Sequence, residues 1–311
     1  MKLDLKKEQI IKLLLAIWII ISHLPIFKPL TVYNYLPVAG FFFLSGYGLM
    51  TKSKNNSKFS CKKSILKIYI PYIIASIVFT LIFEQYSLLI FLKQIFLINV
   101  DLPYGWYIRT QIIIYVFWGI TNRLKNDNHK IALSFILLCI YICAFRYTNQ
   151  IMTSYKTVFA FIFGLLYVNY ESEIYRYINR YTLLIGCIGA ILLRLVISSD
   201  ETILNMLLYN ISGIIFCVPL IYVILKININ NKLLDYLQKY SLDFYLVQGI
   251  SQCFVMKTNF CNKSFLYIEN KILILCLSFF GTIILGILLN EIKEFIFKII
   301  YRRNEEKIWK F

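Results

Sequence analysis

Long apolar runs recur along the whole chain, and they restrict its fold more than any other feature of the sequence. A helix needs about 20 apolar residues to cross a hydrocarbon core of about 30 Å, and several runs reach or approach that length. Backbone amide and carbonyl groups must be hydrogen-bonded inside lipid, so repeated runs of this kind form helices. The alternating pattern of a membrane β-barrel is absent from the sequence. We therefore expect an all-α, polytopic integral membrane protein.

Ten of these runs are predicted to be transmembrane helices of a single domain that covers residues 1–311. The predicted spans are residues 10–27, 34–51, 66–84, 106–122, 131–147, 155–170, 181–197, 203–225, 240–256 and 272–300. The apolar segment 86–98 is too short to span the membrane, and we expect an interfacial or re-entrant helix there. An even number of spans places both termini on the same side of the membrane.

The distribution of positive charge predicts which side that is. The chain has 33 Lys and Arg, 16 Asp and Glu, and a net charge of +17. With both termini in the cytoplasm, 24 of the 33 cations lie on the inner side, as the positive-inside rule expects. The nine outer cations are Lys28, Lys93, Arg109, Arg146, Lys156, Arg194, Lys257, Lys263 and Lys271. We therefore predict a multi-pass protein of the cell membrane that contacts lipid and has no nucleic-acid partner.

His23 and Lys12 are the first candidates for chemistry, because ionisable residues at membrane depth are costly and often functional. His23 is one of two His in the chain, and its side chain suits proton transfer. Lys12 precedes it by eleven positions, which corresponds to about 16 Å along a helix and to nearly the same helix face. Two simpler interpretations remain open: a helix-end His23 satisfied by water or a carbonyl group, and a Lys12 that anchors the helix at the lipid surface.

Small and basic residues follow in two neighbouring segments. Residues 40–50 (GFFFLSGYGLM) combine Ser45 with three Gly, which let a ligand, or equally another helix, approach the backbone closely. The loop 52–67 then carries a cluster of cations that includes Lys62, Lys63 and Lys67. This cluster suits the phosphate groups of an anionic ligand, although topology alone would also explain it.

Arg109 lies in the predicted fourth span, where a guanidinium group needs an acidic partner or an anionic substrate. Asp243 and Glu84 are the candidate partners. The eight Cys contain no CxxC pair, and with only two His the sequence predicts no metal site.

Taken together, these segments resemble the acyltransferase 3 family of membrane-bound acyltransferases, whose members typically have about ten helices and act on cell-surface sugars. The resemblance covers most of the chain in the family's order. It rests on Lys12 and His23 with their ten-residue spacer, on Phe42, Phe43, Leu44, Ser45 and Gly46, and on the basic segment with Lys62, Lys63, Lys67, Tyr69 and Pro71. It continues through Trp106, Tyr107 and Arg109 to Ser241, Tyr245, Leu246 and Gln248.

Four positions depart from the family's usual pattern. Lys12 and Ser64 stand where Arg is common, Gln111 stands near a frequent Glu, and Gln248 stands where a His often ends the late motif. Lysine binds phosphate as a point charge, without the bidentate fork of arginine. The absent Glu and His leave His23 without the usual acidic partner, and Asp243 is the substitute that we consider.

The resemblance implies transfer of an acyl group, most often acetyl from acetyl-CoA, to a hydroxyl of a cell-surface polysaccharide or its lipid-linked precursor. His23 would be the general base or a transient acyl carrier, and Arg109 would stabilise the oxyanion or bind an acidic sugar. The CoA phosphates would be held by Lys12 and the basic segment, with Ser45 nearby in the donor site. A polysaccharide flippase is the main alternative, although the internal repeats and broken helices common in transporters are not evident. A non-catalytic membrane scaffold is a third possibility.

Overall fold

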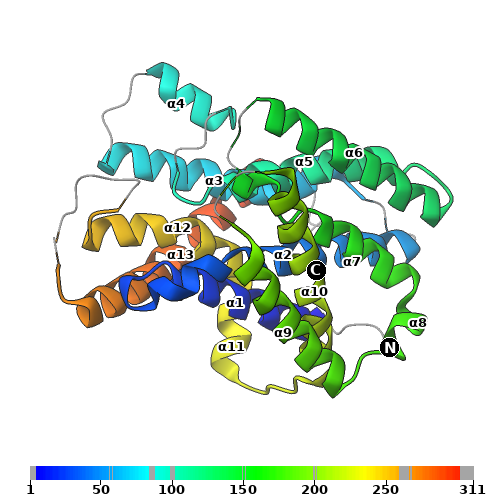
Figure 1. Cartoon of the computed structure of the whole chain (residues 1–311). Coiled ribbons are helices and arrows are strands. Elements are labelled where there is room, and N and C mark those ends of the chain that lie inside the picture. Colours follow the sequence, from blue (N-terminus) through cyan, green and yellow to red (C-terminus); the bar gives the residue numbers. More distant parts are fainter. Residues whose placement is uncertain are drawn as a thin grey trace. The chain divides into compact units, whose positions relative to one another are not determined.

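A computed structural model of the chain describes residues 5–55, 57, 59–83, 88–98, 102–148, 150, 152–198, 200, 202–258, 266 and 268–301. All regular elements in these ranges are helical (Figure 1). The α-helices are α1 (Leu5–Ser22), α2 (Tyr35–Lys54), α3 (Cys61–Phe83), α4 (Leu88–Ile95), α5 (Trp106–Thr121), α6 (Asp127–Tyr147), α7 (Phe159–Asn169), α8 (Glu171–Tyr175), α9 (Arg180–Val196), α10 (Ile203–Lys226), α11 (Lys232–Leu237), α12 (Ser241–Val255) and α13 (Lys271–Tyr301). Three 3₁₀ segments join them: η1 (Pro25–Tyr33), η2 (Met152–Ser154) and η3 (Gln238–Tyr240).

The all-helical prediction is thus confirmed for the described residues. Four helices, α3, α6, α10 and α13, are long and apolar enough to cross a membrane. The other six predicted spans are also helical, but their crossing of the membrane and the cytoplasmic position of both termini stay predictions. The segment 86–98 contains the short helix α4, as expected.

The predicted first span, 10–27, is wrong at its C-terminal end, because α1 already ends at Ser22. Pro25 lacks an amide proton and restricts the residue before it, so it ends the helical hydrogen bonding. The chain turns through η1, which has a kink at Phe27. His23 therefore lies directly after the helix.

The chain divides into two compact units: one contains residues 1–23, 27–65 and 106–239, the other residues 24–26, 66–105 and 240–311. In the first unit, α2 packs against α7 through Gly46 and Gly164. A side-chain carbon at Gly46 would collide with the Phe161 carbonyl, and one at Gly164 with the Phe43 carbonyl. Only glycine permits this close approach of two helix backbones.

Further close contacts hold α1 and α10 against α2, and α9 against α10. A side-chain carbon at Gly40 would lie 2.8 Å from Leu15 of α1, and one at Gly213 of α10 would lie 3.0 Å from Ala39. Gly186 of α9 approaches Pro219 of α10 in the same way. The small residues of α2 thereby place α1 and α10 directly against it.

In the second unit, α12 packs along α13. The Ser251 hydroxyl donates to the Ser278 carbonyl at 2.8 Å, and Gly281 makes room for the Ser251 side chain. A segment before α5 is fixed to α12 as well, because the Tyr245 hydroxyl donates to the Tyr104 carbonyl at 2.8 Å. The end of α4 is held to α3 by a hydrogen bond from the Tyr72 hydroxyl to the Gln94 carbonyl, 3.0 Å long.

Candidate active site

His23 has one ring nitrogen fixed as a donor. Its Nδ1 lies 2.7 Å from the Ile19 carbonyl oxygen, and a carbonyl oxygen only accepts, so Nδ1 carries the proton. In the neutral ring this leaves Nε2 as the basic nitrogen. The side-chain amide nitrogen of Asn34 lies 3.2 Å from that Nε2 and donates to it. The half-buried His23 ring is therefore held in one tautomer, with its basic nitrogen directed away from the helix carbonyl.

The turn between α1 and α2 positions Asn34 for this contact. The Ser22 hydroxyl is hydrogen-bonded to Oδ1 of Asn34, which directs the amide nitrogen of Asn34 toward His23. The Thr31 hydroxyl donates to the Ser22 carbonyl at 2.7 Å and closes the turn. Asn34 was not predicted as a site residue, because nothing in the spacing of the sequence indicates a contact across this turn.

Lys12 lies farther back along α1, in the wall of a pocket of about 480 Å³ that is lined by both polar and apolar residues. The pocket is lined by residues of α1, α2 and α5 with one residue that follows α2: Glu8, Gln9, Lys12, Leu44, Ser45, Tyr47, Gly48, Leu49, Thr51, Lys52, Asn55 and Tyr115. Two predicted donor-site residues, Lys12 and Ser45, thus meet in one cavity. Lys52 adds a second cation, and the buried Thr51 hydroxyl has no hydrogen-bond partner within the described residues.

Glu8 is the counter-ion of Lys12 in this pocket. The Lys12 ammonium lies 2.6 Å from Oε1 of Glu8, one helical turn away. The Glu8 residue is only 5% exposed, while the Lys12 side chain keeps 32% of its surface accessible. Glu8 was missed as a site residue, although the i,i+4 spacing of opposite charges was a usable signal. The pair fixes the ammonium group at the pocket wall.

The glycines of residues 40–50 have different roles. Gly46 is needed for the packing of α2 on α7, whereas Gly48 lines the pocket and leaves open space with only Glu8 Oε1 at 3.9 Å. The packing interpretation is thus confirmed for Gly46, while the approach of a ligand at Gly48 stays a prediction.

Arg109 lies on α5 among residues of α6 and η2. Its Nη2 donates to the Ser154 hydroxyl at 3.3 Å, and its guanidinium carbon lies 4.9 Å from the centre of the Phe145 ring. The neighbouring Thr110 and Tyr141 hydroxyls both donate to the Ser154 carbonyl at 3.0 Å. The structure thus groups Arg109 with Ser154, Lys12 with Ser45, and His23 with Asn34.

The basic segment opens α3. Lys62 is exposed and Lys63 is half-buried in the first turn of the helix, and neither belongs to the lining of the Lys12 pocket. Lys67 is exposed and belongs to the second unit.

Asp243 forms a buried ion pair in the second unit. Its Oδ2 accepts from the Lys293 ammonium at 2.8 Å, joining α12 to α13, and the Asp243 side chain is 0% exposed. Lys293 was not predicted from the sequence as the partner of Asp243. Glu84, the other acidic candidate for a pair with Arg109, lies outside the described residues. No group of three or more His, Cys, Asp or Glu among the described residues is arranged to hold a metal ion.

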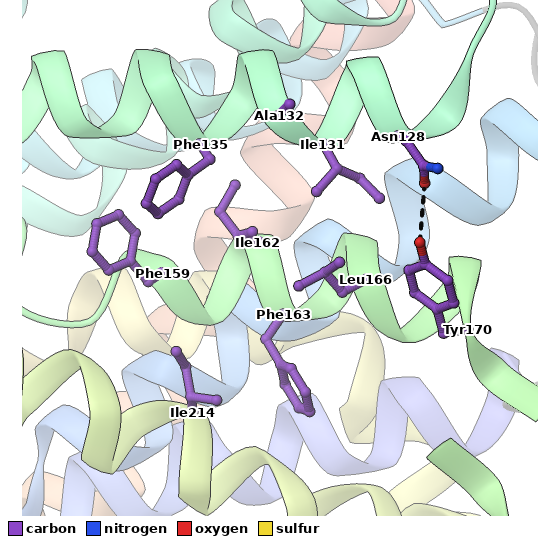
Figure 2. Close-up of a pocket in the computed structure, with 10 residues that line it drawn as sticks. All are labelled: Asn128, Ile131, Ala132, Phe135, Phe159, Ile162, Phe163, Leu166, Tyr170 and Ile214. Carbon is purple, nitrogen blue, oxygen red and sulfur yellow. Dashed lines mark hydrogen bonds between the residues drawn. The ribbon is translucent and has the colours of Figure 1, made fainter. Parts of the chain in front are cut away.

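An apolar groove of about 550 Å³ runs along α6 and α7 and is a separate feature. Figure 2 shows its lining residues, Asn128, Ile131, Ala132, Phe135, Phe159, Ile162, Phe163, Leu166, Tyr170 and Ile214. Two of these residues are joined by a hydrogen bond from the Tyr170 hydroxyl to Oδ1 of Asn128, 3.2 Å long. The lining offers no group suited to proton transfer, so the groove is not part of the candidate active site.

The all-helical fold, with four helices among the described residues that are long and apolar enough to cross a membrane, is consistent with a membrane protein. A family model described as an acyltransferase domain matches residues 9–291. Because the match covers most of the chain, the protein belongs to the acyltransferase 3 family, which confirms the resemblance and supports acyl transfer. No curated protein and no solved structure matches the chain.

Proposed function

We propose that the protein transfers an acetyl group from cytoplasmic acetyl-CoA to a hydroxyl of a cell-surface polysaccharide or its lipid-linked precursor. The observation that carries this proposal is that one helix, α1, connects the pocket at Lys12 with a tautomer-fixed His23. The two residues are about 16 Å apart along the chain's helical rise. An extended pantetheine arm has a comparable length, so it would bring the thioester from the pocket toward His23.

The Lys12 pocket is suited to an anionic, hydrogen-bonding ligand. Lys12 and Lys52 supply positive charge for phosphate groups, while Ser45, Thr51 and Asn55 supply polar side chains in the same wall. We also assign Lys62, Lys63 and Lys67 to the donor, as the resemblance implies, because a cluster of cations attracts phosphate groups.

His23 would act as the general base. The acceptor hydroxyl takes the place of the Asn34 amide at Nε2 and gives its proton to that nitrogen as its oxygen attacks the thioester carbon. The C–S bond then breaks, the sulfur leaves with the proton from Nε2, and the products are the acetyl ester and CoA thiol. In the two-step alternative, Nε2 of His23 first takes the acetyl group from the thioester and then passes it to the acceptor hydroxyl, which gives the same products.

Arg109 and Asp243 are assigned supporting roles in this proposal. The half-buried guanidinium of Arg109 is suited to stabilise a developing oxyanion or to bind an acidic sugar. Asp243 already has Lys293 as its partner, so we assign it to holding α12 on α13.

The test compares acetylation of cell-surface glycans by NMR in cells with wild-type protein, with His23→Ala and without the protein. His129→Ala is the matched control, because His129 is the other His of the chain and is exposed. We expect an acetyl signal with wild type and His129→Ala only. Acetylation by membrane-inserted His23→Ala would remove His23 from the mechanism.

A polysaccharide transporter is distinguished by a second measurement. Purified protein with labelled acetyl-CoA and glycan should release CoA thiol and label the glycan. If wild type does neither while glycan export depends on the protein, acyl transfer is wrong and transport is favoured.

A further inference from the structure

A buried amide, that of Gln111 on α5, lies beside the Lys12 pocket. Gln111 is only 2% exposed, and neither its Nε2 nor its Oε1 makes a hydrogen bond of good geometry with a described residue. A polar neighbour is Tyr115, one turn farther along α5, which interacts with the Gln111 side chain and electrostatically with Glu8. Tyr115 itself lines the pocket. Gln111 thus lies one residue behind the pocket wall.

Two sets of contacts fix the direction of α5 against α2. Near the start of α5, the centre of the Tyr107 ring lies 5.2 Å from that of Phe42, and Tyr107 also interacts with the Ser45 side chain. Farther along α5, Tyr115 shares the lining of the pocket with Thr51 of α2. The two helices are therefore antiparallel, and the earlier residues of α5 lie nearer to the start of α2.

Gln111 lies on this face of α5, midway between Tyr107 and Tyr115. It is one helical turn, about 6 Å, from each of them. Since α2 starts directly after Asn34, which contacts His23, the Tyr107 end of the face is the one nearer to His23. Along the direction of the helices, Gln111 is therefore placed between the pocket and the basic nitrogen of His23.

The chemistry of the Gln111 side chain indicates what kind of ligand it would bind. An amide has two N–H donors and two acceptor lone pairs, so an interaction with Tyr115 alone leaves most of its hydrogen-bonding capacity unused. A buried polar group in this state destabilises the folded chain, whereas an apolar side chain of the same shape would not. Because the amide is uncharged, it is matched to a neutral group that both donates and accepts, rather than to a phosphate.

We propose that Gln111 binds the amide groups of the donor's pantetheine arm, as the arm extends from the Lys12 pocket toward His23. This inference rests on the proposed function and specifies which part of the donor is recognised besides its phosphates. The arm carries secondary amides, each with one N–H donor and one carbonyl acceptor, and the Gln111 amide is complementary to both. The arm reaches Gln111 past Tyr115, the residue of the pocket wall that interacts with it.

The test separates the arm of the donor from its nucleotide. Wild-type protein and Gln111→Met are titrated in nanodiscs with acetyl-CoA and with adenosine bisphosphate, the nucleotide part without the arm. The substitution keeps the length of the side chain and removes both polar atoms. We expect it to weaken acetyl-CoA binding about fivefold, the effect of one lost hydrogen bond between neutral groups, and to leave binding of the bisphosphate unchanged. Lys12→Ala should instead weaken the binding of both ligands.

The stability of the same variant distinguishes a ligand-binding amide from a structural one. Without ligand, Gln111→Met should melt at the same temperature as wild type or higher, because it replaces a buried polar group with an apolar one of similar volume. With acetyl-CoA present at one concentration, the melting temperature of wild type should rise more than that of the variant. A lower melting temperature of the ligand-free variant, with equal loss of both ligands, would assign Gln111 to the core or to a buried water and overturn the proposal.

Gln150→Met is the matched control, because Gln150 is a half-buried Gln of the same unit that follows α6. It should bind acetyl-CoA as wild type does, and an equal loss in this control would contradict the proposal. If Gln111→Met binds acetyl-CoA normally but raises the KM for the glycan, the amide belongs to the acceptor site and the proposal fails.

Failure of the proposed function gives a different result from failure of this inference. Wild type that does not bind acetyl-CoA would overturn the proposed function and this inference with it. Equal acetyl-CoA binding by wild type and Gln111→Met, with acetyl transfer by wild type, would overturn this inference alone.

Discussion

The side-chain amide nitrogen of Asn34 lies 3.2 Å from Nε2 of His23, across a turn that contains two prolines. The contact joins the end of α1 to the residue before α2. Because the Ile19 carbonyl fixes the other ring nitrogen as a donor, Asn34 marks the position that an acceptor hydroxyl would occupy. A geometric role for Asn34 and a chemical role for His23 can therefore be separated by experiment.

Asn34→Ala should lower kcat of acetyl transfer about tenfold while leaving the KM for acetyl-CoA unchanged. The variant keeps the base, His23, but loses the amide that orients its ring. The KM should not change because the predicted acetyl-CoA pocket lies around Lys12, nearer the start of α1. His23→Ala should instead abolish transfer. Steady-state kinetics of purified variants check both predictions, with Asn169→Ala, a half-buried Asn at the end of α7, as the control. Wild-type kinetics in Asn34→Ala would show that Asn34 does not position His23.

Lys12→Ala should raise the KM for acetyl-CoA about tenfold or more, with a smaller effect on kcat. The ammonium group is fixed at the pocket wall by Glu8, so its loss removes a positioned phosphate ligand. Lys12→Arg should restore most of the affinity, since it keeps the charge.

Lys6 is the control on the same helix. Its ion pair with Asp235 is partly exposed, with 42% of the Lys6 side chain accessible, and surface pairs contribute only about 0–1 kcal/mol. Lys6→Ala should therefore leave the KM for acetyl-CoA unchanged. A similar rise in both variants would indicate general electrostatic attraction rather than a site at Lys12.

The sequence predicts the helical class well and the local contacts poorly, for physical reasons. The length of an apolar run determines whether a helix can form in lipid, so the ten helical segments follow from the chain itself. The end of α1 at Ser22 was also encoded, in Pro25. The contact of Asn34 with His23 was not, because a turn sets it and no periodicity reports it.

Of the two ion pairs at the candidate site residues, one could have been predicted from the sequence and the other could not. Glu8 and Lys12 are one turn apart on a helix, so their pairing could have been predicted from spacing. Asp243 and Lys293 are fifty positions apart on different helices, and only the packing of α12 on α13 brings them together. A single sequence contains no signal for such a pair.

Gly46→Ala should destabilise the protein by about 1–3 kcal/mol, because overpacking of a close contact costs this much. The added methyl group would meet the Phe161 backbone, which cannot move as a flexible side chain can. Gly48→Ala, two residues along the same helix, enters open space and should leave stability unchanged. Thermal unfolding in detergent compares the two. Equal melting temperatures would contradict the close packing of α2 on α7.

Asp243→Asn should destabilise the second unit by about 3–5 kcal/mol, because it leaves the Lys293 ammonium without its buried counter-ion. The double variant Asp243→Asn, Lys293→Met removes both charges and should recover much of that stability. Unfolding of the single and double variants gives the coupling energy between the two residues. Recovery of acetyl transfer together with stability would assign Asp243 to the α12–α13 contact. Restored stability without activity would instead return Asp243 to the catalytic machinery, since the carboxylate itself would then be needed for transfer.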